Sequence, residues 1–109
     1  MKPFIINGHN ISSAGVTTSP VYNFRRNAKV IEMFLNVTVE TGTNPTLDVI
    51  CEFSMGDGFW WEGAAFSQVS EVSNEVIEQT SKIGTMMRFK YTVVGEDADF
   101  TFQIGANAK

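Results

Sequence analysis

The sequence predicts an all-β fold, an antiparallel β-sandwich of the jelly-roll or immunoglobulin-like Greek-key type. Apolar and polar residues alternate with a period of two in several runs, which is typical of strands that bury one face. Turns rich in glycine, proline and asparagine separate these runs, as in domains built from two packed antiparallel sheets. Nine Phe and two Trp among the 109 residues supply enough bulk to fill the space between such sheets.

The N-terminal segment, residues 1–15, is expected to be an arm that precedes a single domain at residues 16–109. Phe4, Ile5 and Ile6 form a short apolar patch, and the Asn-, Gly- and Ser-rich residues after it favour turns over strand ladders. Three alternatives are open for this patch. It docks on a neighbouring subunit, forms the first edge strand of its own sandwich, or is disordered.

The first half of the domain contains the clearest strand signals. Residues 16–24 predict a short edge strand, because Pro20 has no N–H to donate to a central ladder. A polar turn is expected at residues 25–27. Strong alternation follows in residues 30–40 and 46–53. The residues between these two runs include Gly, Asn and Pro, so we expect a short turn that joins the runs as an antiparallel hairpin.

The second half of the domain continues the pattern with one ambiguous stretch. The valines of residues 67–82 fit a helical spacing, but β-branched residues and serines weaken a helix, so a strand, a loop and a second short strand are expected. Residues 86–93 alternate again, residues 95–97 predict a turn, and residues 99–104 close the fold as a last strand.

The inward faces of these runs define the expected core, and the one cysteine, Cys51, lies among them. A single cysteine excludes an internal disulfide, and in an apolar run it behaves as a small buried hydrophobe. The other expected core residues are Ile31, Met33, Leu35, Val37, Leu47, Val49, Phe53, Phe89, Tyr91, Phe100 and Phe102.

Charge and hydropathy exclude two classes of partner. The net charge is −4 and the isoelectric point is about 4.8, so the surface repels nucleic-acid phosphates and anionic lipid headgroups. No stretch approaches the roughly 18 apolar residues that a spanning helix requires. The first residues lack the long apolar region of a secretory signal, so we expect a product that is not secreted.

The sequence contains no recognisable catalytic or metal-binding pattern, so we expect neither an enzyme nor a cofactor. His9 is the only histidine, and no cysteine or further histidine lies near it at a metal-ligand spacing. No serine lies in a nucleophile-elbow pattern. Glu96, Asp97 and Asp99 carry oxygen ligands that calcium prefers, but their spacing is not that of an EF-hand, and a solvated turn is the expected role.

The segment from Ser54 to Trp61 partly matches an Asp-box hairpin, Ser-x-Asp-x-Gly-x-Thr-Trp. The Ser, Gly and Trp positions match, whereas Gly56 stands at the Asp position and Trp60 at the Thr position. The two adjacent tryptophans must point to opposite faces of a strand, so one enters the core. For the outward one, three roles remain open: a protein interface, stacking on a sugar ring, and ordinary packing within the chain.

Four segments carry a resemblance to a known family. They are Gly-Thr-Asn-Pro-Thr-Leu-Asp-Val at residues 42–49, the hairpin at 54–61, Arg-Phe-Lys-Tyr-Thr-Val-Val-Gly at 88–95, and Phe-Thr-Phe at 100–102. Together they resemble small β-sandwich proteins of tailed-phage and prophage structural modules, over residues 28–104. These motifs are typical of turns and core positions, so they indicate the fold better than the function. Within the hairpin, Met and Gly replace the family's residues after the serine, which weakens any ligand inference from it.

The resemblance implies a non-catalytic virion component, either a capsid decoration protein or a head- or tail-associated one. Its implied partners are the phage capsid or other virion proteins and further copies of itself, with a trimer as one fitting arrangement. Its implied location is the virion, after synthesis in the bacterial cytoplasm. The rival hypothesis is a carbohydrate-binding module of a tail or adhesin that stacks a sugar on an exposed tryptophan. The interface candidates are Phe4, Ile5, Ile6, Phe34, Trp60 and Trp61; Phe34 is among them because it interrupts an otherwise polar strand face.

The expected core can be tested by truncating one of its side chains. We expect Leu35→Ala to lower the free energy of unfolding by about 2–5 kcal/mol, from lost transfer energy and the cavity left behind. Chemical denaturation measures this change. An unchanged denaturation midpoint would mean that the two faces of this strand are assigned the wrong way round.

Overall fold

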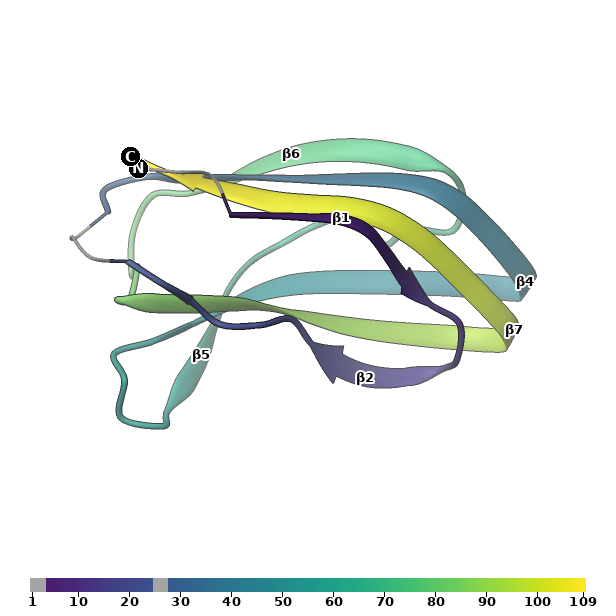
Figure 1. Cartoon of the computed structure of the whole chain (residues 1–109), viewed down its shortest axis with the longest axis horizontal. Coiled ribbons are helices and arrows are strands. Elements are labelled where there is room, and N and C mark those ends of the chain that lie inside the picture. Colours follow the sequence, from purple (N-terminus) through teal and green to yellow (C-terminus); the bar gives the residue numbers. More distant parts are fainter. Residues whose placement is uncertain (1–3, 25–27) are drawn as a thin grey trace.

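Two long strands, β4 (Ile31–Ser54) and β7 (Met86–Ala108), organise the fold. They have 24 and 23 residues and pair antiparallel along nearly their whole length, from Ile31 opposite Ala108 to Ser54 opposite Met86. Both strands bend in the middle, so the sheet folds back and its two halves face each other (Figure 1). The computed structural model describes residues 4–24 and 28–109.

Five shorter strands extend the two halves at their edges. The upper half, as drawn in Figure 1, contains residues 31–41 of β4 and 99–108 of β7, with β1 against β7 and β6 against β4. The lower half contains residues 46–54 of β4 and 86–94 of β7, with β2 and β3 against β7 and β5 against β4. The short strands are β1 (Phe4–Ile11), β2 (Gly15–Thr18), β3 (Tyr22–Asn23), β5 (Trp60–Ala65) and β6 (Ser73–Gln79).

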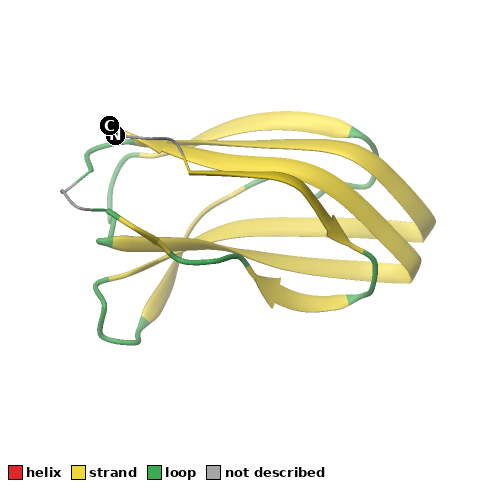
Figure 2. Cartoon of the chain, in the orientation of Figure 1, coloured by secondary structure: helices red, strands yellow, loops and turns green. Residues whose placement is uncertain are grey.

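The predicted all-β, antiparallel class is confirmed. The described residues form one antiparallel sheet of seven strands, and Figure 2 shows strands and loops without a helix in that part of the chain. The ambiguous stretch at residues 67–82 contains β6 and an isolated bridge between Val69 and Leu47. The turn expected at residues 25–27 and the first three residues of the expected arm lie outside the described ranges.

The prediction that residues 30–40 and 46–53 form a hairpin is wrong. These two runs are consecutive parts of β4, and both pair with β7 instead of with each other. The segments expected as turns, residues 41–45 and 95–97, are the bends of the two long strands. They lie opposite each other, with Thr43 paired to Glu96. A bend and a hairpin use the same turn-forming residues, so the local sequence does not separate them.

The two bends fit closely because glycines stand where the backbones approach. Gly42 has φ +123°, and a Cβ added there would lie 2.8 Å from the Asp97 carbonyl oxygen. Gly95 has φ +130°, and its Cβ would lie 2.8 Å from the Pro45 Cα. Any other residue at these positions would be strained by its φ angle and would collide with the opposite strand. The bends therefore depend on both glycines.

The N-terminal segment forms an edge strand, the second of its three alternatives. β1 pairs with β7 from Phe4 opposite Ala106 to Ile11 opposite Phe100, with a bulge between Ile6 and His9. It is therefore part of the same sheet as the expected domain, and not a separate arm over the residues that the structure describes. The apolar side chains on its inner face supply the reason, since pairing with β7 removes them from water.

The predicted core residues all lie in the interior between the two halves, so the face assignments are confirmed. The buried side chains of β4 come from both sides of its bend, as do those of β7. Each of the twelve has at most 2 % of its surface exposed: Ile31, Met33, Leu35, Val37, Leu47, Val49, Cys51, Phe53, Phe89, Tyr91, Phe100 and Phe102.

The bend can be tested with a matched pair of glycine substitutions. Gly15 has φ +139° but nothing within 4 Å of its virtual Cβ, whereas Gly95 has a similar φ and a backbone contact at 2.8 Å. Gly15→Ala should lower the free energy of unfolding by the backbone strain alone, about 1–3 kcal/mol. Gly95→Ala should cost about 1–3 kcal/mol more, because the new methyl overpacks the bend. Urea denaturation of both variants gives the difference, and equal losses would contradict a close approach at the bend.

Candidate interaction surface

An apolar row crosses the outer face of the upper half. The strand register places Ile5 opposite Gly105, Gly105 opposite Phe34, and Phe34 opposite Val76. Residues directly opposite each other point to the same face of a sheet, and the residues on either side of Phe34 in β4 are buried in the core. These four residues, here called the apolar row, therefore point outward. Ile5 and Val76 are 45 % and 68 % exposed.

Phe34 lies over the glycine at the centre of this row. A Cβ added to Gly105 would lie 2.6 Å from Cε1 of the Phe34 ring. The ring thus covers the backbone of β7 and leaves Gly105 buried and Phe34 half-buried. Because Gly105 has no side chain, the Phe34 ring can lie this close to the backbone of β7. The centre of the outer face is therefore apolar.

A row of amide side chains flanks the apolar row on one side. Asn36 lies opposite both Gln103 and Asn74 in the register, and the Gln103 Nε2 donates a hydrogen bond to the Asn7 Oδ1. These four residues are called the amide row. Each lies two positions from a member of the apolar row on its own strand, so all share the outer face.

An acidic row flanks the apolar row on the other side. Glu32 lies opposite Asn107 in β7 and opposite Glu78 in β6. Lys109 forms an ion pair with Glu32 at the end of the sheet, and Glu32, with a smaller contribution from Glu78, raises the pKa of the Lys109 ammonium. An apolar centre with polar margins is the usual anatomy of a protein–protein interface.

The register divides the predicted N-terminal patch between the two faces of β1. Ile5 points outward in the apolar row, whereas Phe4 and Ile6 are partly buried against the core. The Phe4 ring stacks on Tyr22 at 5.1 Å and on Phe89 at 6.4 Å between centroids. Of the three residues, only Ile5 remains available at the surface, and it lies in the same row as Phe34.

The two tryptophans lie in the lower half, away from the apolar row. Trp61 packs against the core near Phe53, with centroids 6.3 Å apart, and its Nε1 donates to the Lys82 carbonyl at 2.9 Å. Trp60 points to the outer face, where the Arg88 guanidinium carbon lies 4.1 Å from its ring centroid. The prediction that the two tryptophans point to opposite faces is thus confirmed, and each ring has a contact within the chain.

The loop before these tryptophans is stabilised by its own polar side chains. The Ser54 Oγ accepts a hydrogen bond from the Gly56 N–H at 3.0 Å, and the Asp57 Oδ1 accepts one from the Phe59 N–H at 3.0 Å. The partial Asp-box therefore works as a turn. Phe59 is 64 % exposed and was not among the sequence candidates, although its place between a glycine and two tryptophans was a signal for it.

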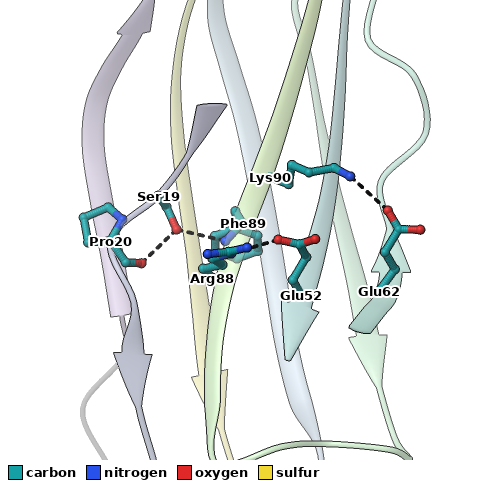
Figure 3. A network of polar contacts seen from close by, with 7 residues as sticks. All are labelled: Ser19, Pro20, Glu52, Glu62, Arg88, Phe89 and Lys90. Carbon is teal, nitrogen blue, oxygen red and sulfur yellow. Dashed lines mark hydrogen bonds and ion pairs between the residues drawn. The ribbon is translucent and has the colours of Figure 1, made fainter. Parts of the chain in front are cut away.

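The outer face of the lower half carries two ion pairs that join neighbouring strands. The Arg88 Nε contacts the Glu52 Oε1 at 2.8 Å, and the Lys90 Nζ contacts the Glu62 Oε2 at 3.1 Å (Figure 3). Figure 3 also shows the Ser19 hydroxyl, which accepts a hydrogen bond from the Phe89 N–H at 2.8 Å and donates to the Pro20 carbonyl at 2.9 Å. The charged groups of Arg88, Glu52, Lys90 and Glu62 are thus paired within the chain.

A hollow of about 310 Å³ opens between β6 and the loop before it. Its apolar lining residues are Leu35 and Val69, which are buried in the core. The Glu75 carboxylate accepts hydrogen bonds from the Ser67 N–H at 2.7 Å and from the Ser67 hydroxyl at 3.0 Å. These bonds hold the loop against β6, so the loop side of the hollow is fixed in place. It is lined by Leu35, Ser67, Gln68, Val69, Ser70, Glu71, Ser73, Asn74 and Glu75, with no aromatic ring.

The side chains of His9, Tyr91 and Asp99, which could act in catalysis by their chemistry, are described by their contacts with neighbouring residues. His9 packs its ring on Tyr91 and Phe102, at 5.3 Å from each. Burial raises the pKa of the Tyr91 hydroxyl, which has no partner at hydrogen-bonding geometry, although the nearby Ser19 hydroxyl partly opposes the rise. In the turn expected to be solvated, Asp99 accepts a hydrogen bond from the Asn10 Nδ2 at 2.7 Å. Among the described residues, no three His, Cys, Asp or Glu side chains are grouped as metal ligands would be.

Comparisons with known proteins gave no match from which the role of the apolar row could be inferred. No protein-family model and no curated protein matches the chain. Within residues 4–24 and 28–109, no helix is long and apolar enough to cross a membrane.

The buried thiol gives a prediction with a defined pH dependence. Burial raises the pKa of Cys51 from 9.0 to about 11, so the folded protein should react very slowly with a thiol reagent in neutral buffer. Between about pH 9 and pH 11 the unfolded chain loses this proton and the folded chain keeps it, so the stability that depends on Cys51 falls as pH rises. Denaturation of the wild type and of Cys51→Ala across this range measures the effect, and the unfolded wild type in urea is the labelling control. A stability difference that stays constant with pH would contradict the assignment.

Proposed function

We propose that the chain is a non-catalytic structural protein of a tailed-phage virion, either a capsid decoration protein or a head- or tail-associated one. The observation that carries the proposal is the apolar row of Ile5, Phe34 and Val76 across Gly105, bounded by an amide row and an acidic row. Exposed apolar groups with polar margins on a rigid sheet form a surface that suits assembly with another protein.

The family resemblance supports the same proposal from different residues. The segments 42–49 and 88–95 that carry it lie on β4 and β7 and include Gly95 at one bend and the buried Phe89 and Tyr91. These segments contribute to the bend and to the core, and the two long paired strands hold the outer face of the upper half in place. Such a face fits attachment to a protein lattice.

The rival proposal, sugar binding by an outward tryptophan, has less support. One face of the Trp60 ring already carries Arg88, and that arginine also pairs with Glu52. A sugar that used this side of the ring would have to displace a guanidinium held by two contacts. Sugar-binding platforms are usually open aromatic faces, so the apolar row is the better supported site.

The proposal predicts that the protein is found in purified virus particles. Particles would be induced from the bacterial host that carries the gene, banded on a density gradient and probed with an antibody against the chain. We expect the chain to band with the particles in amounts comparable to other structural proteins. Detection only among free proteins at the top of the gradient would contradict a virion role.

The contribution of the apolar row can be measured in the same preparation. Val76→Asp places a charge in the row, and the matched control Val16→Asp places one on β2 in the lower half, at a residue of similar exposure, 62 % against 68 %. We expect the first variant to lower the amount of the chain in particles several-fold and the second to leave it unchanged. Circular dichroism of both variants would verify that each is folded.

A further inference from the structure

One asparagine of the amide row lies in the bulge of β1. The register between β1 and β7 shifts within this strand, so Asn7 and Gly8 together lie opposite the single residue Gln103. A bulge disrupts the ladder locally and leaves its extra residue unpaired. Asn7 is also the only asparagine in the sequence that is followed directly by glycine. The bulge therefore combines an irregular backbone with the residue pair in which an asparagine side chain is most open to attack by its own main chain.

We propose that Asn7 is a site of spontaneous covalent modification, at which the side-chain amide is converted into a carboxylate. The backbone nitrogen of Gly8 gives up its proton to water or hydroxide and attacks Cγ of Asn7. The new N–Cγ bond closes a succinimide ring, and Nδ2 takes up a proton and leaves as ammonia. Water then opens the ring. Cleavage at the side-chain carbonyl gives aspartate, and cleavage at the main-chain carbonyl gives isoaspartate.

The attacking nitrogen belongs to a residue that has open space beside it. Gly8 has φ +60°, in the left-handed region, and a Cβ added there would have nothing within 4 Å. Without a side chain of its own, Gly8 does not hinder the rotation of the main chain that brings its nitrogen toward Cγ of Asn7. Ring closure within a chain is fast only where the reacting atoms can reach this geometry.

Gln103 activates the carbon that is attacked. Its Nε2 donates a hydrogen bond to Oδ1 of Asn7, and this is the oxygen on which negative charge develops when Cγ is attacked. A donor placed at such an oxygen stabilises the tetrahedral intermediate. The side chain of Asn7 is exposed, so water can also reach the ring that it must open. Nucleophile, electrophile, donor and water thus meet at one bulge.

Two other asparagines of the amide row provide an internal comparison. Asn36 and Asn74 lie on the same outer face as Asn7, but they are paired with each other in a ladder without a bulge. Val37 and Glu75 follow them in the sequence, and both carry side chains that hinder the approach of the backbone nitrogen. Regular pairing also fixes the main chain at both positions. We therefore expect the conversion at Asn7 and not at these two residues.

The modification would change the edge of the sheet in two ways. Either product places a carboxylate beside the apolar row, in a chain that already has a net charge of −4. Isoaspartate also inserts a methylene group into the main chain of β1, which enlarges the bulge. Phe4, whose ring stacks on Tyr22 and Phe89, lies on the N-terminal side of this bulge. We expect the modified chain to hold Phe4 less firmly and to have a lower denaturation midpoint.

The first experiment is storage of the folded chain at neutral to mildly alkaline pH, with peptide mapping by mass spectrometry as the readout. The conversion is detected as the mass gain of an amide that becomes an acid, and chromatography separates aspartate from isoaspartate. We expect Asn7 to convert at least about tenfold faster than Asn36 and Asn74, because a small misplacement of a nucleophile costs orders of magnitude in rate. Asn7→Gln is the chemical control, since its longer side chain would have to close a larger ring.

The second experiment tests the donor with variants of matched length. Gln103→Met keeps the length and neutrality of the side chain but has no N–H, and Gln103→Lys has an N–H donor again. We expect Gln103→Met to slow the conversion of Asn7 several-fold and Gln103→Lys to restore it. In urea, where no neighbour is held beside Asn7, all three chains should convert at the same rate. Circular dichroism and the denaturation midpoint verify that both variants are folded without urea.

Two results would overturn the proposal. The first is a stored, folded chain in which Asn7 converts no faster than Asn36 and Asn74. The second is a Gln103→Met variant that converts as fast as the wild type or faster, because the hydrogen bond from Gln103 would then restrain Asn7 and not activate it. Neither result bears on whether the chain is present in particles, so the virion proposal is tested separately.

Discussion

The ladder between β4 and β7 is the interaction on which the rest of the structure depends. Every shorter strand pairs with one of these two, and none of the described short strands pairs with another in the sheet. The interior exists only because both long strands bend together, which brings Phe102 in the upper half against Tyr91 in the lower half, with ring centroids 5.3 Å apart. The bend in turn needs two backbones to approach at Gly42 and Gly95. Without it, the apolar inner faces of both halves would remain in water.

Local pattern predicted the faces of the strands well and their partners poorly. Alternation identified Ile31 to Val37 and Leu47 to Phe53 as buried positions, because burial of one face leaves a period of two in the sequence. The same residues between them, with glycine, asparagine and proline, serve a hairpin or a bend equally well. Which of the two forms depends on β7, a strand more than forty residues away in the sequence. The bend of β7 at Gly95 lies in register with the bend of β4. A sequence read locally carries no information about that register.

In the candidate surface, too, single residues could be identified from the local sequence, but their neighbours on the sheet could not. Phe34 and Ile5 could be singled out in the sequence, one as an apolar residue on a polar face and the other as part of an apolar patch. Their meeting in one row, together with Val76 and Gly105, depends on three separate strand pairings. Trp60 and Trp61 looked stronger by residue type, but Arg88 and the Lys82 carbonyl satisfy them within the chain. Residue type indicates a capacity for binding, and register decides whether it remains available.

The order of the strands also constrains how the protein is made. β7 pairs with β1, β2, β3 and β4, yet it is the last of the seven strands to leave the ribosome. Until it emerges, four strands have unpaired edges and apolar faces, and at about 5–20 residues per second of synthesis this state lasts for seconds. Pairings between distant parts of a chain also close slowly. Folding therefore completes only after β7 is released.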